Sequence, residues 1–212
     1  MTSIIHEIKE PFPFLQIENL YSEDELKLIW QELDFLTYPH KLEPPESTGT
    51  ARDNKSKAPL KSNSGLFLDE IYYKRNISNI LNINSKLFSP EILTIFSKLS
   101  FGYETIKKTN NDRTLISYYE NGGYYKSHED NAIYTAVTWF FREPKAFTGG
   151  DFYFTDYNLK IEIQNNMTIL FPSFVKHAVD EINLKDNNLS GYGRYAMSQF
   201  VYLSDMTVSN DK

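Results

Sequence analysis

The sequence predicts an α+β fold in which helices come first and pack against an antiparallel double sheet. Up to residue 112, segments with helical spacing of apolar residues alternate with polar stretches. From Arg113 onward, short runs rich in β-branched and aromatic residues alternate with turn signals. Because strands follow helices instead of alternating with them, the pattern favours an α+β arrangement over a parallel α/β sheet.

The helical region begins with a strong start signal at Ser22. Glu25 follows three residues later, a spacing typical of a capping box, in which each residue's side chain bonds the other's backbone N–H. Apolar residues then recur on one face of the predicted helix, at Leu26, Ile29, Trp30 and Leu33. We therefore expect the first helix to start directly after Ser22.

A long polar loop and further helices complete this region. The stretch 39–64 contains four prolines and several lysines, and we expect it to be a loop. It is either a lid over a bound substrate or a solvated insertion, and the sequence favours neither. Helical spacing returns in 67–83, and 89–99 starts another helix with Ser89 as its cap and Pro90 in the first turn.

The β-rich region contains about seven candidate strands, as expected for a sandwich or barrel. They lie in 113–119, 132–141, 149–154, 159–164, 167–172, 175–182 and 193–203. Gly149 and Gly150 precede one of them, where a turn with positive φ is expected.

Composition narrows the function. The net charge of −6 argues against a nucleic-acid partner, which would favour a basic surface. The absence of cysteine excludes disulfides and zinc-thiolate sites and fits a reducing interior. Without a membrane-length apolar run or an unbroken signal-like segment, we expect a cytoplasmic protein with no membrane partner. The sequence leaves the oligomeric state open.

The segment "YENGGYYKSHED" (119–130) suggests a metal site. A strand projects residues i and i+2 to one face, so His128 and Asp130 would point together. His177 lies in a later apolar strand that follows a Pro-Ser turn. Two histidines and one carboxylate form the facial triad of non-haem iron(II) enzymes. Zinc hydrolases share such ligands but also need a general base, and the sequence leaves that alternative open.

Arg194 extends this pattern. It lies in the candidate strand beyond His177. If it is buried it needs an anion, because a guanidinium does not lose its charge. A carboxylate bound to the metal is a natural bidentate partner, whereas an ordinary surface arginine is the alternative.

With these residues in this order, the chain resembles the prolyl 4-hydroxylase-like branch of the Fe(II)/2-oxoglutarate-dependent dioxygenases. The resemblance covers about 113–203 and is carried by "YENGGYYKSHED", "FTGGDFYF", "FPSFVKHAVDEI" and "GRYAMSQF". It implies a double-stranded β-helix, or jelly roll, with N-terminal flanking helices. We expect one domain over 1–212, with a mostly helical N-terminal region (residues 1–112) and a jelly-roll catalytic core (residues 113–203).

The resemblance also implies roles for individual residues. His128, Asp130 and His177 would bind iron, and Arg194 would pair with the distal carboxylate of 2-oxoglutarate. Tyr119 matches a tyrosine that contacts the cosubstrate in relatives, and Tyr125 would line the pocket. Fe(II), 2-oxoglutarate and dioxygen are thus the implied cofactors, with ascorbate as a candidate reactivator.

One contact made in some relatives is in doubt. These relatives carry a second tyrosine on the strand after the His-x-Asp motif, and it helps to hold the distal carboxylate. Here Trp139 and Phe140 stand at that place.

The expected reaction is hydroxylation of an unactivated C–H bond, with release of succinate and CO2. The resemblance favours a prolyl residue in a peptide or protein as substrate, and a free amino acid or small metabolite is the alternative. A jelly-roll binding protein without turnover is the alternative outside the enzymes.

Overall fold

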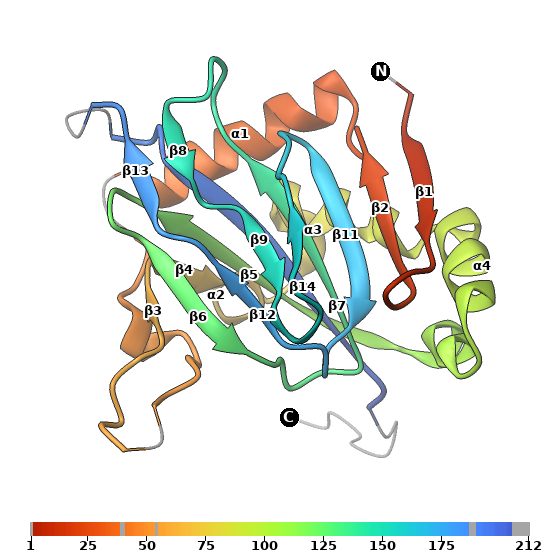
Figure 1. Ribbon diagram of the computed structural model, residues 1–212. Coiled ribbons are helices and arrows are strands. Elements are labelled where there is room, and N and C mark those ends of the chain that lie inside the picture. Colours follow the sequence, from red (N-terminus) through yellow and green to blue (C-terminus); the bar gives the residue numbers. More distant parts are fainter. Residues whose placement is uncertain (1, 39–40, 54, 187–189, 205–212) are drawn as a thin grey trace, which may run out of the picture.

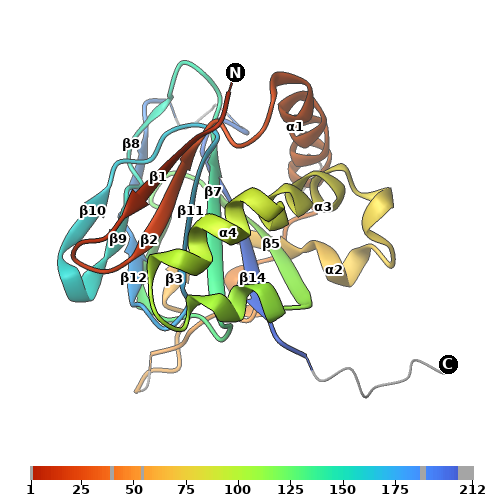
Figure 2. The same cartoon turned by 90° about the vertical axis from the view of Figure 1, so that its right-hand side faces the viewer.

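The computed structural model describes residues 2–38, 41–53, 55–186 and 190–204. Helices, a seven-stranded sheet and a five-stranded sheet form successive layers (Figures 1 and 2). All strand pairs are antiparallel, and the larger sheet is the middle layer. The predicted helices packed on an antiparallel double sheet are therefore confirmed.

The larger sheet contains strands from both regions of the chain. Its order is β1 (Ile4–Ile8), β2 (Phe14–Glu18), β11 (Met167–Pro172), β7 (Tyr134–Phe140), β14 (Arg194–Tyr202), β5 (Asn111–Tyr119) and β4 (Ser64–Phe67). The N-terminal region, expected to be mostly helical, thus supplies both edges of this sheet. Pairing of β2 with β11 and of β4 with β5 satisfies backbone groups that would otherwise be exposed.

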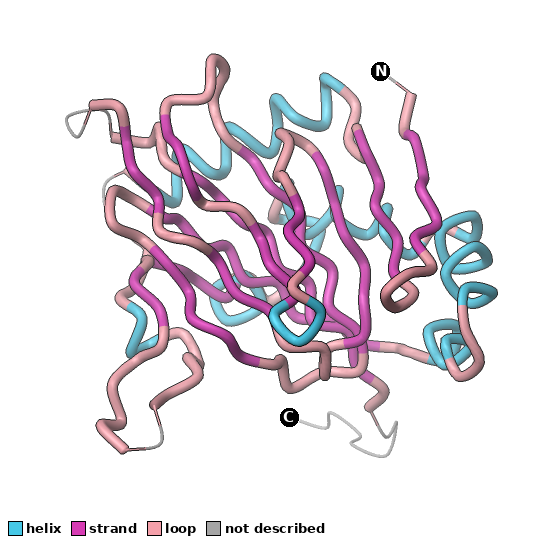
Figure 3. The backbone as a smooth tube through the Cα atoms, in the orientation of Figure 1, coloured by secondary structure: helices cyan, strands magenta, loops and turns pink. Residues whose placement is uncertain are grey.

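The smaller sheet faces the larger one and is made mostly from the β-rich region. Its order is β10 (Leu159–Ile161), β9 (Phe152–Phe154), β12 (His177–Val179), β6 (Tyr124–His128) and β3 (Lys61–Ser62). A separate two-stranded sheet pairs β13 (Ile182–Leu184) with β8 (Phe147–Gly149). The arrangement of strands against helices can be followed in Figure 3.

Helices cover the outer face of the larger sheet. The α-helices are α1 (Glu23–Thr37), α2 (Leu68–Ile71), α3 (Asn79–Ile83) and α4 (Pro90–Leu99). Short 3₁₀ turns lie at η1 (Pro45–Ser47), η2 (Arg75–Ile77), η3 (Asn84–Phe88), η4 (Tyr103–Lys108) and η5 (Thr155–Tyr157). In the described portion of the chain, no helix is long and apolar enough to cross a membrane.

Both predicted helix starts are confirmed. The Ser22 hydroxyl accepts a hydrogen bond from the Glu25 backbone N–H at 3.3 Å, and the Glu25 carboxylate accepts one from Ser22 N–H at 2.6 Å. Ser89 caps α4 through the backbone N–H of Ile92, with Pro90 in the first turn. These side chains satisfy N–H groups that the first turn leaves unpaired.

The segment 67–83, predicted to be helical, is broken into α2, η2 and α3. Tertiary contacts explain the breaks. The Asp69 carboxylate accepts a hydrogen bond from Thr114 N–H on β5 at 2.6 Å, and Arg75 pairs with Asp112 at 3.0 Å. Ser78 then caps a new helix through Leu81 N–H. Such short helices have little stability of their own, so contacts with the sheet decide their boundaries.

Alternation of side chains along the strands separates two apolar cores and determines which face of the larger sheet Arg194 points to. On β14, Tyr195 and Met197 pack in the core beneath the helices, whereas Ala196 packs in the core between the sheets. Arg194 shares the inner face with Ala196 because residues two apart on a strand point the same way. On β7, Trp139 likewise belongs to the inner core.

The Gly-Gly turn before β9 has the expected positive φ, at 69° for Gly149 and 72° for Gly150. A Cβ at Gly149 would clash with the backbone oxygen of Glu181, and one at Gly150 would lie 3.2 Å from Cδ of Arg194. The turn therefore needs glycine both for its backbone conformation and for its close packing beside β14.

We predict that Gly149→Ala destabilises the protein more than Gly102→Ala. Both positions have positive φ, so each substitution adds strain of about 1 kcal/mol or more. Only Gly149 meets a backbone atom, since a Cβ at Gly102 has nothing within 4 Å. Urea unfolding measures both free energies of unfolding. Equal losses would contradict the role assigned to the Glu181 contact.

Candidate metal centre

Two neighbouring strands of the smaller sheet bring the histidines together. His128 ends β6 and His177 begins β12, and the two residues are paired in the antiparallel register. The distance between their ring centroids is 4.3 Å. Adjacent positions on paired strands place both imidazoles on the inner face.

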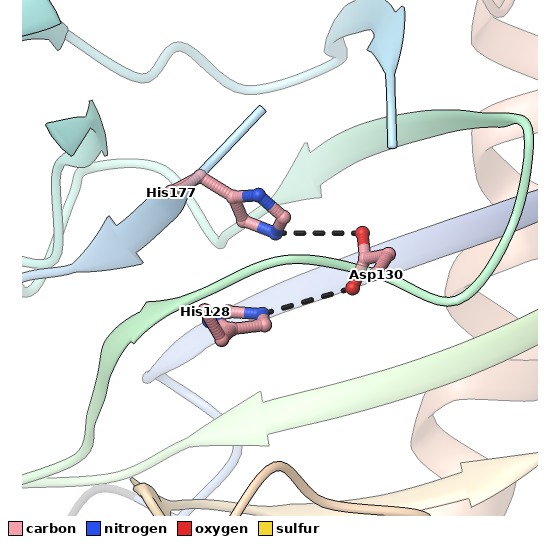
Figure 4. Close-up of side chains that lie close together, drawn as sticks. All are labelled: His128, Asp130 and His177. Atoms are coloured by element: carbon pink, nitrogen blue, oxygen red, sulfur yellow. Dashed lines mark ion pairs between the residues drawn. The ribbon is translucent and has the colours of Figure 1, made fainter. Parts of the chain in front are cut away.

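Asp130 reaches the same point from a loop. The prediction treated 128–130 as one strand, but β6 ends at His128. The loop is held instead by a hydrogen bond from Asp130 N–H to the Ser173 carbonyl oxygen at 3.0 Å. Its carboxylate lies between the two rings, 3.7 Å from Nε2 of His128 and 3.4 Å from Nε2 of His177 (Figure 4).

The three side chains form a compact, buried donor set. Their ligand atoms all lie within 4.8 Å of one another. The exposed fractions of the side chains are 6% for His128, 11% for Asp130 and 5% for His177. Two imidazole nitrogens and one carboxylate match the preferred facial ligands of Fe(II).

A backbone carbonyl determines which ring nitrogen of each histidine carries the proton and which one is free to bind a metal. Nδ1 of His128 lies 2.9 Å from the Lys126 oxygen, and Nδ1 of His177 lies 2.9 Å from the Val175 oxygen. Because a carbonyl only accepts, both Nδ1 atoms carry the proton and Nε2 keeps its lone pair. Burial, followed by the neighbouring His177, holds the pKa of His128 well below 6.5. The ring is therefore neutral, as a ligand must be.

Two hydroxyl groups orient the Asp130 carboxylate. Thr135 Oγ1 donates a hydrogen bond to Asp130 Oδ2 at 2.7 Å, and Ser173 Oγ lies 2.8 Å from Thr135 Oγ1. Thr135 and Ser173 are both fully buried. Neither residue is recognisable from the sequence, because a threonine at the start of β7 gives no local sign that it faces a carboxylate.

Arg194 lies in the same cavity with its charge unpaired. The residue is completely buried, and none of its three guanidinium nitrogens has a hydrogen-bond partner among the described residues. Its Cζ lies 4.8 Å from the ring centroid of Tyr119 and 5.9 Å from that of Trp139. These rings position the guanidinium, and an anion would both accept its N–H hydrogen bonds and compensate its charge.

The two predicted tyrosines both line the cavity. Burial raises the pKa of Tyr119, and the adjacent Arg194 and Asn63 partly oppose this shift. The Tyr125 ring stacks on His128, with centroids 3.5 Å apart and an interplanar angle of 13°. Its hydroxyl accepts a hydrogen bond from Ala51 N–H at 3.4 Å. Both phenols therefore stay protonated near neutral pH.

Two further polar groups were not predicted as site residues. Trp139 is fully buried, and its Nε1–H has no acceptor among the described residues. Lys61 on β3 is only 4% exposed and lines the cavity with the triad. Burial lowers the pKa of Lys61 to about 8, and the negative charge of Asp130 limits this fall.

The inner cavity adjoins an outer chamber of about 430 Å³. Gly49, Phe67, Tyr125, Asp130 and Phe200 line both spaces. A segment of the predicted long loop 39–64 forms a wall, because residues 47–51 contribute to the chamber lining or to the cavity. Residues 39, 40 and 54 of that loop lie outside the described residues.

Comparison with known proteins identifies this architecture. No family model matches the sequence, and no curated protein matches it either. Solved structures do match over nearly the whole chain. A Pseudomonas putida prolyl-4-hydroxylase is 15% identical with a TM-score of 0.54, and the alignment covers 91% of this chain and 93% of that one. The chain has the fold of the Fe(II)/2-oxoglutarate-dependent oxygenases.

Two more structures support this oxygenase fold. A viral collagen prolyl hydroxylase from Paramecium bursaria Chlorella virus-1, solved as a 2-oxoglutarate complex, is 14% identical with a TM-score of 0.54, over 89% of this chain and 94% of that one. A 2OG-Fe(II) oxygenase family protein from Burkholderia pseudomallei is 14% identical with a TM-score of 0.55, over 91% and 86%. The resemblance inferred from the four motifs is thus confirmed at the level of the fold, and the described chain carries the His-Asp-His cluster.

We predict that Thr135→Val weakens Fe(II) binding about 10- to 100-fold, because Asp130 loses the hydroxyl that orients it. Anaerobic calorimetric titration with Fe(II) measures the affinity. Thr138→Val is the matched control, since it removes another buried β7 hydroxyl, which bonds Thr168 instead. A similar loss of affinity in both variants would contradict the specific role of Thr135.

Proposed function

We propose that the protein is an Fe(II)- and 2-oxoglutarate-dependent oxygenase that hydroxylates an unactivated C–H bond. The observation that carries the proposal is one buried cavity that holds both the His-Asp-His cluster and an unpaired guanidinium. The cluster fits a divalent metal, and the guanidinium fits a dicarboxylate beside it.

His128, Asp130 and His177 are the proposed iron ligands. The Nδ1 hydrogen bonds of the histidines and the Thr135 hydroxyl fix the orientation of the ligands before the metal arrives. If these three residues hold the iron, its remaining coordination positions would be available to cosubstrate and dioxygen. This preorganisation reduces the cost of assembling the centre.

Arg194 is the proposed anchor for the distal carboxylate of 2-oxoglutarate. Its N–H groups would find there the acceptor that the described protein lacks. Trp139 shares the inner face of the larger sheet, and we propose that its Nε1–H donates to the same carboxylate where some relatives use tyrosine. Phe140 belongs to the core beneath the helices and is turned away from this site.

The protein's residues would bind and orient the iron, 2-oxoglutarate and substrate and shield them from water, whereas the iron and 2-oxoglutarate would supply the oxidation chemistry. With iron and 2-oxoglutarate in place, one atom of dioxygen enters the C–H bond and the other enters succinate, with release of CO2. Tyr119 and Tyr125 line the cavity and limit access of water. Ascorbate as a reactivator stays a prediction, as does the cytoplasmic location.

A prolyl residue in a peptide or protein is the proposed substrate. The similarity to a bacterial prolyl-4-hydroxylase and a viral collagen prolyl hydroxylase supports this choice. The outer chamber beside Asp130 has the size of ordinary ligand pockets and gives a peptide access to the centre. A free amino acid or small metabolite is the second candidate, favoured by the buried Lys61 ammonium in the same cavity.

We predict that anaerobic addition of Fe(II) and 2-oxoglutarate produces the weak visible charge-transfer band of their chelate. His128→Ala should abolish the band because a metal ligand is lost. Arg194→Met should need at least about tenfold more 2-oxoglutarate, because one charged hydrogen-bonding partner is removed. Absorption spectroscopy in an anaerobic cuvette measures both effects.

Arg142→Met is the control for Arg194→Met, since Arg142 pairs with Asp34 and stacks on Trp30 away from the cavity. No band in folded wild-type protein would overturn the proposed function and favour a binding protein or a hydrolase. A band with no uptake of dioxygen in the presence of prolyl peptides would instead count against the prolyl substrate.

We also predict that Trp139→Phe raises the dissociation constant of 2-oxoglutarate about 5- to 15-fold. The ring packing is largely kept, whereas one N–H donor worth about 1–1.5 kcal/mol is lost. The chelate band measures this affinity. An unchanged dissociation constant would show that the indole N–H does not reach the cosubstrate.

A further inference from the structure

Lys61 is a second buried cation in the cavity, and the iron and 2-oxoglutarate sites do not account for it. It lies on β3, the edge strand of the smaller sheet, where it pairs with Tyr125 on β6. Its Nζ lies 5.5 Å from the Tyr125 ring centroid, and the residue is 4% exposed. Lysines are almost never this buried unless they are paired.

No described carboxylate forms an ion pair with Lys61. The negative charge that acts on it is that of Asp130. In the proposed enzyme this carboxylate is a metal ligand, so a divalent ion would outweigh its charge. The loaded centre would therefore leave the Lys61 ammonium without compensation.

A charge count supports a further anion. Fe(II) and Arg194 together carry three positive charges. Asp130 and the two carboxylates of 2-oxoglutarate carry three negative charges, and both histidines are neutral at their metal-facing nitrogens. The inner site is thus balanced without Lys61, which adds one positive charge in a space where unpaired charges are costly.

The location of Lys61 separates it from the cosubstrate anchor. Lys61 lies on an edge strand of the smaller sheet, whereas Arg194 lies on the larger sheet. Lys61 pairs with Tyr125 on β6, and the Tyr125 ring stacks on His128, so Lys61 lies at the metal end of the cavity. The Tyr125 ring beside it also lines the outer chamber, through which a substrate would approach.

We propose that Lys61 binds a carboxylate of the substrate, so that the substrate is an acid with its carboxylate close to the oxidised C–H bond. This inference rests on the proposed oxygenase function. The acid is either a free amino acid or a peptide with an acidic residue next to the reacting one. In both cases the ammonium and the carboxylate neutralise each other beside the metal and fix which C–H bond faces it.

The test uses the complete protein loaded with Fe(II) and 2-oxoglutarate without oxygen. Three probe pairs are titrated: acetate and acetamide, L-proline and L-prolinamide, and two capped peptides, Ala-Pro-Glu and Ala-Pro-Gln. Perturbation of the charge-transfer band reports binding near the metal. We expect the carboxylate member of at least one pair to bind about tenfold or more tighter than its amide.

Variants assign this preference to Lys61. Lys61→Met should abolish it and leave 2-oxoglutarate affinity unchanged within about twofold, whereas Lys61→Arg should keep some of it. Lys126→Met is the matched control, because it removes an exposed lysine from the neighbouring strand β6. Urea unfolding establishes that the variants are folded.

The outcomes distinguish a failure of the proposed Lys61 role from a failure of the oxygenase function. A normal band with no carboxylate preference in any pair, or a preference that survives in Lys61→Met, would overturn the role of Lys61 and leave the oxygenase function standing. Weaker 2-oxoglutarate binding in Lys61→Met, with the preference retained, would also overturn it. The absence of any band in wild-type protein would overturn the proposed function itself. Preference in the proline pair indicates a free amino acid, and preference in the peptide pair indicates an acidic peptide.

Discussion

The cavity is organised by one electrostatic constraint, the burial of a guanidinium that keeps its charge. Arg194 is completely enclosed between the sheets, and no described group accepts its hydrogen bonds. Burying an unpaired ion costs several kcal/mol. Pairing of β14 with both β5 and β7, in the middle of the larger sheet, holds the residue there despite this cost. An anion that enters the cavity therefore restores interactions that the fold leaves unmade.

The proposed metal centre follows the opposite principle, since its three proposed ligands already have hydrogen-bond partners before any metal binds. Both imidazoles donate from Nδ1 to backbone carbonyls, and Thr135 donates to Asp130. Stacking of His128 on Tyr125 and of His177 on Phe152 further limits rotation of the rings. These contacts hold the His128–Asp130–His177 triad in place, whereas the Arg194 guanidinium has no hydrogen-bond partner among the described residues. This contrast fits a site that keeps its metal and exchanges its organic ligands.

The two cationic side chains of the cavity come from different sheets. Arg194 comes from the larger sheet, and Lys61 comes from an edge strand near the outer chamber. The two positive groups thus lie on different sheets but line the same cavity. The outer chamber combines aromatic side chains with the Arg113–Glu70 ion pair. Such a mixed lining suits an amphipathic ligand more than a purely apolar one.

Sequence alone identified what depends on local pattern and residue type. The capping box at Ser22, the positive φ of Gly149 and the strand that carries Arg194 follow from spacing and backbone chemistry. The two histidines were chosen because imidazole and carboxylate ligands are recognisable by type. These features require no knowledge of which segments meet in space.

Tertiary structure decided everything that depends on segments distant in sequence. Thr135 contacts Asp130 only because the loop after β6 is tied to Ser173, and Lys61 enters the cavity only because β3 pairs with β6. The breaks in 67–83 likewise come from contacts with β5, since short helices take their boundaries from packing. A side chain's chemistry can be read from the sequence, but its partners are determined by the folded chain. Sequence therefore determined the donors of this site, and the fold decided which of them meet and which charge is left unpaired.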